Sequence, residues 1–250
     1  MTDFGLYGGF PADPGAPERD LQGYLRGMRK SQIPGASDIW GIGRANLPEG
    51  IVPITYTWAE IERDTAWAAL MLEEMGVGAD SFCFFSTVVS LAGQFWPWHS
   101  AVFHSGGRFA NGMPTSWDAY RLEMYLRLFN LKLVFALTSD VLDGIEAMKK
   151  SLSDVFGKAE IITALPGAHE RLTAAGFKPW RVSWLGPIFA LDPCDGTGGR
   201  FDNAQWTLES DNGQILISSK EGRTTPFVRT PTGVRGEMRS VGGEPRLFVA

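Results

Sequence analysis

The sequence predicts an α/β fold, with a mostly parallel sheet flanked by helices and a small antiparallel β region at the C-terminal end. Two observations support this. Between residues 54 and 186, short apolar runs of strand length alternate with longer segments of helical periodicity. From Pro187 onward, strand-like runs alternate with turns only. Of 250 residues, 44% are hydrophobic and 20% are charged, so the chain can build a sizeable core.

The clearest helix is predicted over Tyr56–Gly76. Thr57 and Glu60 form a capping box, in which each side chain accepts a hydrogen bond from a backbone N–H at the helix start. Gly76 is typical of a helix end. Residues 1–53 are rich in Gly and Pro and are predicted to be irregular, apart from a short helix over Glu18–Lys30.

The domain organisation follows from these changes of pattern. We predict an irregular N-terminal segment at 1–53, an α/β domain at 54–186, and an antiparallel β region of the same domain at 187–250. Strands are expected at 81–88, 108–110, 131–137, 160–164 and 180–185. Helices are expected at 91–103, from 116 onward, at 139–156 and at 169–175. The helix from Ser116 is expected to bury Tyr120, Met124 and Leu128.

Charge and cysteine content exclude several functions. The net charge of -5 argues against nucleic acid as the main partner, because phosphate binding needs clustered Lys and Arg. Cys83 and Cys194 are far apart, so neither a disulfide framework nor a metal site is expected. The longest apolar run, 82–98, is interrupted by polar residues, so no membrane span is expected. The first residues lack the pattern of a secretion signal, and a cytoplasmic protein is the expectation.

Several weaker patterns lack the features that a functional site requires. Gly41-Ile42-Gly43 lacks the Lys and the flanking context of a phosphate loop. The five-residue spacing of His99 and His104 does not place both rings on one helix face. His104 and Ser105 lack the G-x-S-x-G pattern of a hydrolase. Three aspartates around a Gly-rich loop are too widely spaced for calcium and favour a solvated turn: Asp192, Asp195 and Asp202.

The stretch from Gly213 to Val234 carries a family resemblance. A strand over Gln214–Ser219 follows an Asn-Gly turn and pairs with a strand-like run at Ala204–Leu208. The stretch resembles the G-E-L-V-L-T strand and the M-P-[LVI]-I-R-Y-R-T-G-D loop of adenylate-forming enzymes of the phenylacetate-CoA ligase type. The segment around Thr57–Glu60 is similar to the T-[YW]-x-[ED]-[IL] helix start of the same family. The resemblance covers about residues 54–240.

The same resemblance identifies the ATP-binding features of the family that this sequence replaces. Val234 stands where the family has the Asp that binds the ribose of ATP, and a Val side chain accepts no hydrogen bond. The stretch 40–53 holds no S-S-G-T-T-G phosphate loop. Gly186 is retained, but Ile188 and Phe189 follow where a Glu holds Mg²⁺. The chain stops at Ala250, before the domain with the family's catalytic Lys. The resemblance therefore implies no catalytic residue, no metal and no cofactor.

The expected function is that of a non-catalytic, truncated and degenerate ligase relative. It would bind an acyl or acyl-CoA ligand, or a partner enzyme, in the catabolism of aromatic, fatty or sterol-derived acids. The alternative is an active acid-CoA ligase with altered machinery, or one completed by a separate lid subunit. A polar, open cleft near Gly186 and Arg229 would favour the active ligase. A cleft filled by side chains would favour the non-catalytic protein. The residues expected to bind the ligand are Gln94, Trp96, Trp98, His99, Trp184, Gly186 and Arg229.

Association with a second protein chain is also expected. In the full-length ligases further parts of the fold cover apolar surface that this chain would leave open, and large apolar patches are uncommon on soluble monomers. A homodimer or a complex with a pathway enzyme is therefore predicted.

Overall fold

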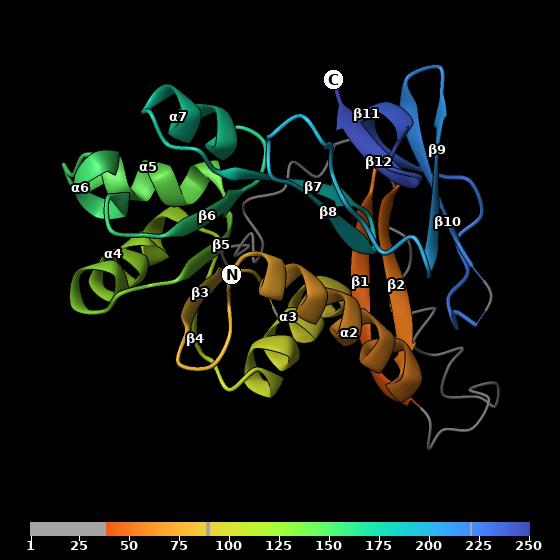
Figure 1. The fold of residues 1–250 in the computed structure, drawn as a ribbon, viewed down its shortest axis with the longest axis horizontal. Helices are drawn as coiled ribbons and strands as arrows, with labels where there is room; N and C mark the ends of the chain where they lie inside the picture. The colour runs from red at the N-terminus through yellow and green to blue at the C-terminus, as the bar shows by residue number, and fades with distance from the viewer. Residues whose placement is uncertain (1–38, 89–90, 221) are drawn as a thin grey trace, which may run out of the picture.

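The computed structural model describes residues 39–88, 91–220 and 222–250 and confirms the predicted fold class (Figure 1). A six-stranded sheet has the order β4-β3-β5-β6-β7-β8. Strands β4, β3, β5, β6 and β7 run parallel to one another, and β8 is antiparallel to β7. The strands are β3 (Phe82–Ser86), β4 (Arg108–Gly112), β5 (Leu133–Leu137), β6 (Ile161–Ala164), β7 (Trp180–Leu185) and β8 (Ile188–Asp192).

Helices cover both faces of this sheet, as parallel strands require. On one face lie α2 (Trp58–Glu74) and α3 (Ala92–His104), whose apolar side chains pack on β3, β5, β7 and β8. The other face packs on four helices. These are α4 (Ala119–Leu128), α5 (Ser139–Ala147), α6 (Leu152–Phe156) and α7 (Ala168–Ala174), and a short 3₁₀ turn, η2 (Ser116–Asp118), precedes α4 and contacts α5.

A separate four-stranded antiparallel sheet follows, with the order β12-β11-β10-β9. Its strands are β9 (Trp206–Asp211), β10 (Gln214–Ser219), β11 (Thr230–Val241) and β12 (Glu244–Val249). The predicted hairpin is confirmed: Asn212 and Gly213 both have positive φ, at 50° and 76°, as a two-residue turn of this kind requires.

The chain enters the described region through a hairpin that was not predicted. Strands β1 (Ile39–Leu47) and β2 (Gly50–Thr57) pair antiparallel and are joined by Pro48 and Glu49. Residues 39–53 read as irregular because of their glycines, yet Gly43 serves close packing. A Cβ at Gly43 would lie 2.5 Å from the Cβ of Ala92 on α3. The helix expected over Glu18–Lys30 lies outside the described residues.

Two helix predictions were wrong in detail. Helix α4 buries Ala119, Leu122 and Leu126, while Tyr120 and Leu128 are 51% and 56% exposed. The helix carries apolar residues on more than one face, so periodicity alone did not identify the face that packs on the sheet. The helix expected over 139–156 is two helices, α5 and α6, because Lys149 adopts a positive φ of 58° and Ser151 caps a new helix.

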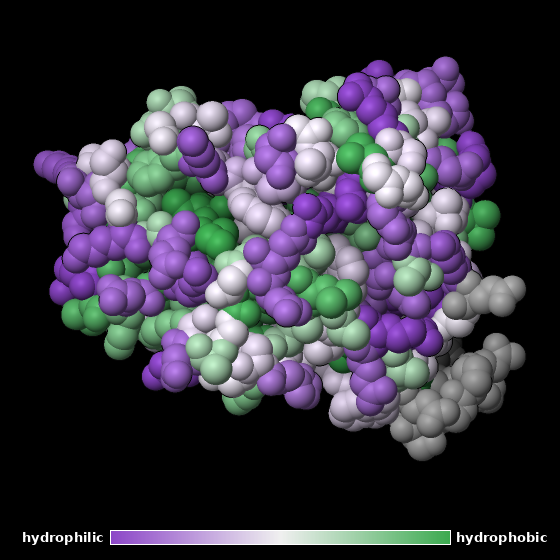
Figure 2. Space-filling view, in the orientation of Figure 1, coloured by the Kyte–Doolittle hydropathy of each residue, from purple (hydrophilic) through white to green (hydrophobic). Residues whose placement is uncertain are grey.

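A third core joins the two sheets. It contains buried apolar residues of β1, β2, β7, β8 and the antiparallel strands. On the face shown in Figure 2, hydrophilic and hydrophobic residues are interspersed. Within the described ranges, no helix has the length and apolar character needed to cross a membrane.

Candidate functional site

The carboxyl edge of the parallel strands is where open α/β sheets bind ligands, and Gly186 lies at this edge, directly after β7. Gly186 follows β7 with a φ of 74°. Its carbonyl accepts hydrogen bonds from Gln94 Nε2 and, at 2.7 Å, from Trp184 Nε1. A Cβ at Gly186 would lie 2.6 Å from a methyl carbon of Leu47. The space beside Gly186 is therefore occupied by side chains.

Three buried polar atoms at the start of α3 and the end of β3 lack a hydrogen-bond partner within the described structure. They are Ser86 Oγ, Thr87 Oγ1 and Gln94 Oε1. Their side chains belong to residues that are 2%, 7% and 0% exposed. Buried polar atoms are ordinarily paired with protein or water, so this edge has unused capacity for a polar ligand or for water.

The other residues expected in the site are dispersed. His99 is buried between the rings of Phe95 and Phe85, and its Nε2 is hydrogen-bonded to Asn111 Oδ1. Burial lowers the pKa of His99, so its ring is neutral near pH 7. Trp96 is 37% exposed. Arg229 lies on the antiparallel sheet, where its guanidinium binds the Glu209 carboxylate at 2.8 and 2.9 Å.

Trp98 lines a small cavity between α2, α3 and the strands β8 and β9. The cavity has a volume of about 20 Å³, which is room for about one water molecule. Its walls are formed by Asp64, Trp67, Gly93, Pro97, Trp98, Ile188, Phe189, Asp202 and Trp206. The indole Nε1 of Trp206 is buried without a hydrogen-bond partner in the described part of the chain. The walls are thus aromatic, with two carboxylates and one unused N–H donor.

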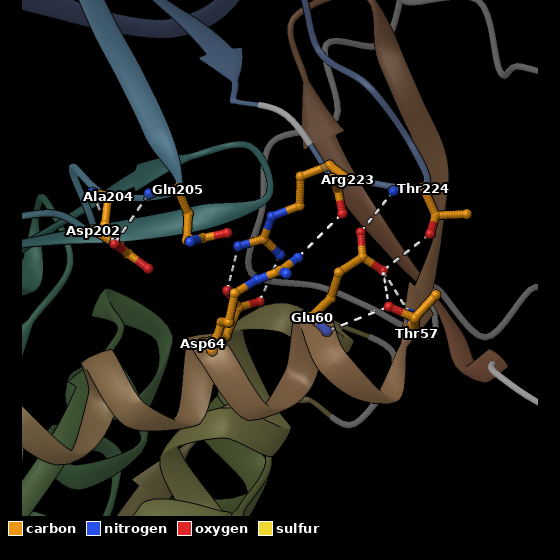
Figure 3. A network of polar contacts seen from close by, with 10 residues as sticks. Thr57, Glu60, Asp64, Asp202, Ala204, Gln205, Arg223 and Thr224 are labelled. Atoms are coloured by element: carbon orange, nitrogen blue, oxygen red, sulfur yellow. Dashed lines mark hydrogen bonds and ion pairs between the residues drawn. The ribbon is translucent and has the colours of Figure 1, made fainter.

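A buried ion pair joins Asp64, which lines this cavity, to the loop between β10 and β11 (Figure 3). Arg223, in the β10–β11 loop, donates through both terminal nitrogens to the Asp64 carboxylate on α2, with one N···O distance of 3.0 Å. The side chains are 3% and 13% exposed. The guanidinium also lies 4.7 Å from the ring centroid of Trp206. Burial raises the pKa of Asp64, and the positive charge of Arg223 opposes that rise.

Glu60 extends this network to the start of α2. It is the acidic member of the predicted capping box, which is confirmed. Its carboxylate also accepts the backbone N–H of Thr224 at 2.7 Å and the Thr224 hydroxyl at 3.2 Å (Figure 3). One residue further on, Thr225 Oγ1 accepts the backbone N–H of Thr55 at 3.0 Å. The loop of the family-like motif is therefore held against α2 and β2 through side chains.

The burial of Asp202 contradicts the prediction that this residue lies in a solvated turn. The residue is 8% exposed, and its Oδ1 accepts the backbone N–H groups of Ala204 and Gln205 at 3.1 and 3.2 Å. Burial raises the pKa of Asp202, and the negative charge of Asp64 raises it further.

The pKa of Asp202 gives a prediction for stability against pH. Because the pKa is higher in the folded than in the unfolded state, its contribution to stability is present at low pH and is lost as pH rises through the folded pKa. Asp202→Asn keeps an oxygen acceptor for both amides and removes the charge. We expect a higher melting temperature than wild type near pH 8 and a smaller difference near pH 4. An unchanged difference across that range would contradict the assignment.

Sequence reasoning missed the Arg223–Asp64 pair. Asp64 falls on the core-facing side of α2, between Ile61 and Ala68, and an acid in such a stripe was the available signal. Its partner is 159 residues away and has no local signature. No group of three or more His, Cys, Asp or Glu within 39–88, 91–220 and 222–250 is arranged to hold a metal ion.

Comparison with solved structures shows what this arrangement resembles. The open conformation of 2-hydroxyisobutyryl-CoA ligase, in complex with 2-HIB-AMP and CoA, matches with a TM-score of 0.67 at 14% identity, over 90% of this chain and 61% of that one. The fold of this chain therefore matches part of the fold of that acyl-CoA ligase. ATP-bound MatB from Rhodopseudomonas palustris matches with a TM-score of 0.55 at 11% identity, over 86% of this chain and 48% of that one.

A third solved structure matches at similarly low identity and over a similar part of its length. Wild-type E. coli MenE, with a bound phenylether-linked analogue of OSB-AMS, has a TM-score of 0.53 at 12% identity, over 84% of this chain and 48% of that one. The chain thus spans between 48% and 61% of the length of these three ligases. No protein-family model matches the sequence, and a search of curated proteins finds no match.

Proposed function

We propose that this protein is a non-catalytic relative of the acyl-CoA ligases, most similar to the phenylacetate type, that binds an acyl group or a partner enzyme. The observation that carries the proposal is the filled sheet edge at Gly186. Leu47 packs on that glycine, and Gln94 and Trp184 use its carbonyl. Arg229, the other residue expected at an open cleft, is paired with Glu209. This is the arrangement expected of the non-catalytic protein.

Two further features support the same proposal. The stretch where the resemblance expects a phosphate loop is the β1–β2 hairpin, whose connection is only Pro48 and Glu49. Val234, where the ribose-binding Asp is expected, packs on the core that joins the two sheets. Neither position offers a group that holds a nucleotide.

The first experiment is thermal unfolding with Mg-ATP. A ligand that binds only the folded state stabilises it by RT ln(1 + [L]/Kd), about 2.7 kcal/mol when its concentration is a hundred times Kd. We expect millimolar Mg-ATP to leave the melting temperature unchanged, and a panel of aryl- and alkyl-CoA esters to raise it or to quench Trp fluorescence. A rise of several degrees with Mg-ATP alone would overturn the non-catalytic proposal.

One observation favours the active-ligase alternative. Ser86, Thr87 and Gln94 leave three buried polar atoms unused at the carboxyl edge of the sheet, and such atoms suit a polar ligand at this edge. Acid-dependent exchange of pyrophosphate into ATP, measured with and without an extract of the host, distinguishes the active ligase from the non-catalytic protein. Exchange in either condition would establish adenylation and support the alternative, including completion by a separate subunit.

The expected association belongs to the proposal as well. Trp40, Trp58 and Trp96 make edge-to-face contacts at the surface, with centroids 6.4 and 5.7 Å from Trp40, and Trp58 is 56% exposed. Exposed clustered indoles are typical of interaction surfaces. Light scattering across a dilution series measures this, and a mass near 27.4 kDa throughout would rule out a homodimer.

A further inference from the structure

A thiol and an imidazole meet near the end of the β7–β8 pair that lies opposite the Gly186 turn. Cys194 lies in the loop after β8, and His169 lies in the first turn of α7. The Sγ of Cys194 is 3.4 Å from Nε2 of His169. Cys194 is exposed, whereas Cys83, the other cysteine of the sequence, is buried. The chain therefore presents a single accessible thiol, in contact with a base.

The backbone holds the thiol in this position. Cys194 has a φ of 60°, in the left-handed region that is unfavourable for a non-glycine residue. The Asp192 carboxylate fixes the turn by accepting the Cys194 N–H at 2.8 Å. A strained residue held by its neighbours is a frequent feature of functional sites.

His169 is held in contact with the thiol. The residue is 6% exposed, so its orientation is fixed by packing. Its Nδ1 lies 3.8 Å from the Glu170 carboxylate and has no hydrogen-bond partner among the described residues. In the tautomer with the proton on Nδ1, Nε2 accepts the proton of Cys194, whose sulfur also lies 3.6 Å from the Asp192 carbonyl oxygen.

Both groups are uncharged near pH 7. Burial and the Arg181 charge lower the pKa of His169. Burial and the charge of Asp192 raise the pKa of Cys194. A protonated thiol reacts poorly with peroxides and disulfides, which require the thiolate. It suits a reaction in which a base removes the proton during attack on a carbonyl carbon.

Arg181 supplies a positive charge close to Cys194 and His169. It lies on β7, and its positive charge acts on both His169 and Cys194. Its Nη2 lies 4.0 Å from the Glu170 carboxylate, whereas its Nε is buried without a hydrogen-bond partner among the described residues. A positive charge beside a nucleophile favours the negative charge that develops on a carbonyl oxygen under attack.

We propose that Cys194 accepts an acyl group from an activated acyl donor, a thioester or aryl ester, with His169 as general base. The Cys194 sulfur forms a bond to the carbonyl carbon, and its proton passes to Nε2 of His169. Arg181 stabilises the oxyanion of the tetrahedral intermediate. The intermediate expels the thiolate or phenolate of the donor, which takes the proton from His169. The products are S-acylated Cys194 and a free thiol or phenol.

The test uses p-nitrophenyl acetate on the full chain and needs neither an acyl pocket nor CoA. We expect a stoichiometric burst of p-nitrophenolate and one added acetyl group on Cys194 by peptide mass analysis. Cys194→Ala is expected to abolish the burst, and His169→Gln to slow it about a hundredfold or more. His104→Gln, at an exposed histidine of α3, is the matched control and is expected to leave the rate unchanged.

Acetylation that persists in Cys194→Ala, or equal rates in His169→Gln and wild type, would overturn the proposal. If His169→Gln does not fold, the wild-type rate of alkylation by iodoacetamide is measured against pH. The ionisable groups that act on the pair are Glu170, Arg181, Asp192 and Asp195. General-base assistance predicts an inflection in the histidine range, and a rise that follows thiol ionisation alone contradicts it. Because the reagent is small and lacks CoA, a negative result leaves the proposed ligase-like function untouched.

Discussion

Replacing Arg223 by Met is expected to lower the free energy of unfolding by about 3–5 kcal/mol, the usual cost of removing one partner of a buried ion pair. The change leaves the Asp64 carboxylate buried without its two donors and removes the cation from the face of Trp206. It also leaves Glu60 and Asp202 as uncompensated neighbours of Asp64. For a chain of this length the melting temperature should fall by about 2–4 °C for each kcal/mol, which thermal unfolding by circular dichroism measures.

The matched control is Arg229→Met. Arg229 is also an arginine beside a carboxylate, but its side chain is 52% exposed and that of Glu209 is 42% exposed. An exposed pair contributes about 0–1 kcal/mol, so this variant should melt close to wild type. Adding Asp64→Asn to Arg223→Met should restore part of the loss, because it removes the buried charge. Equal melting temperatures for the two arginine variants would show that burial does not set the strength of the Arg223 pair.

Local features of the sequence were sufficient for much of the fold. Helix α2 was predicted because its start is specified by neighbouring residues, Thr57 and Glu60, whose reciprocal hydrogen bonds span three positions. The β9–β10 hairpin was predicted because Asn212 and Gly213 favour positive φ whatever lies around them. Strand β7 was predicted with its observed bounds, Trp180–Leu185.

Features that depend on distant contacts were not predictable in the same way. The strands β1 and β2 form although Gly41 and Gly43 weaken them locally, because pairing and the close approach of Ala92 compensate. Gln94 and Gly186 do meet across 92 residues, but their inclusion in the site came from the family resemblance. The same resemblance included Arg229, whose side chain is turned to Glu209. The Cys194–His169 contact had no signal in the spacing of the two residues.

Trp98→Ala is expected to cost about 3–5 kcal/mol of stability, as for other large buried aromatic residues. The side chain is 2% exposed and packs edge-to-face on Trp67 with centroids 5.6 Å apart. It also forms one wall of the cavity beside Gly93, so the space vacated would join the existing 20 Å³. The enlarged space would keep aromatic walls beside its two carboxylates, and engineered cavities with apolar walls bind small aromatic molecules. Indole, which replaces the lost ring, should therefore raise the melting temperature of the variant in a concentration-dependent way.

Trp96→Ala provides the comparison two residues earlier on α3. Trp96 is 37% exposed and does not line the cavity, so its loss should cost less, and indole should have no effect. The pair of variants also tests the acyl-binding half of the proposed function. If the cavity is the closed remainder of an acyl pocket, phenylacetate should stabilise Trp98→Ala but not Trp96→Ala. Stabilisation by indole without any response to phenylacetate would show that the space accepts an aromatic ring but not a carboxylate, and would favour the partner-binding form of the proposal.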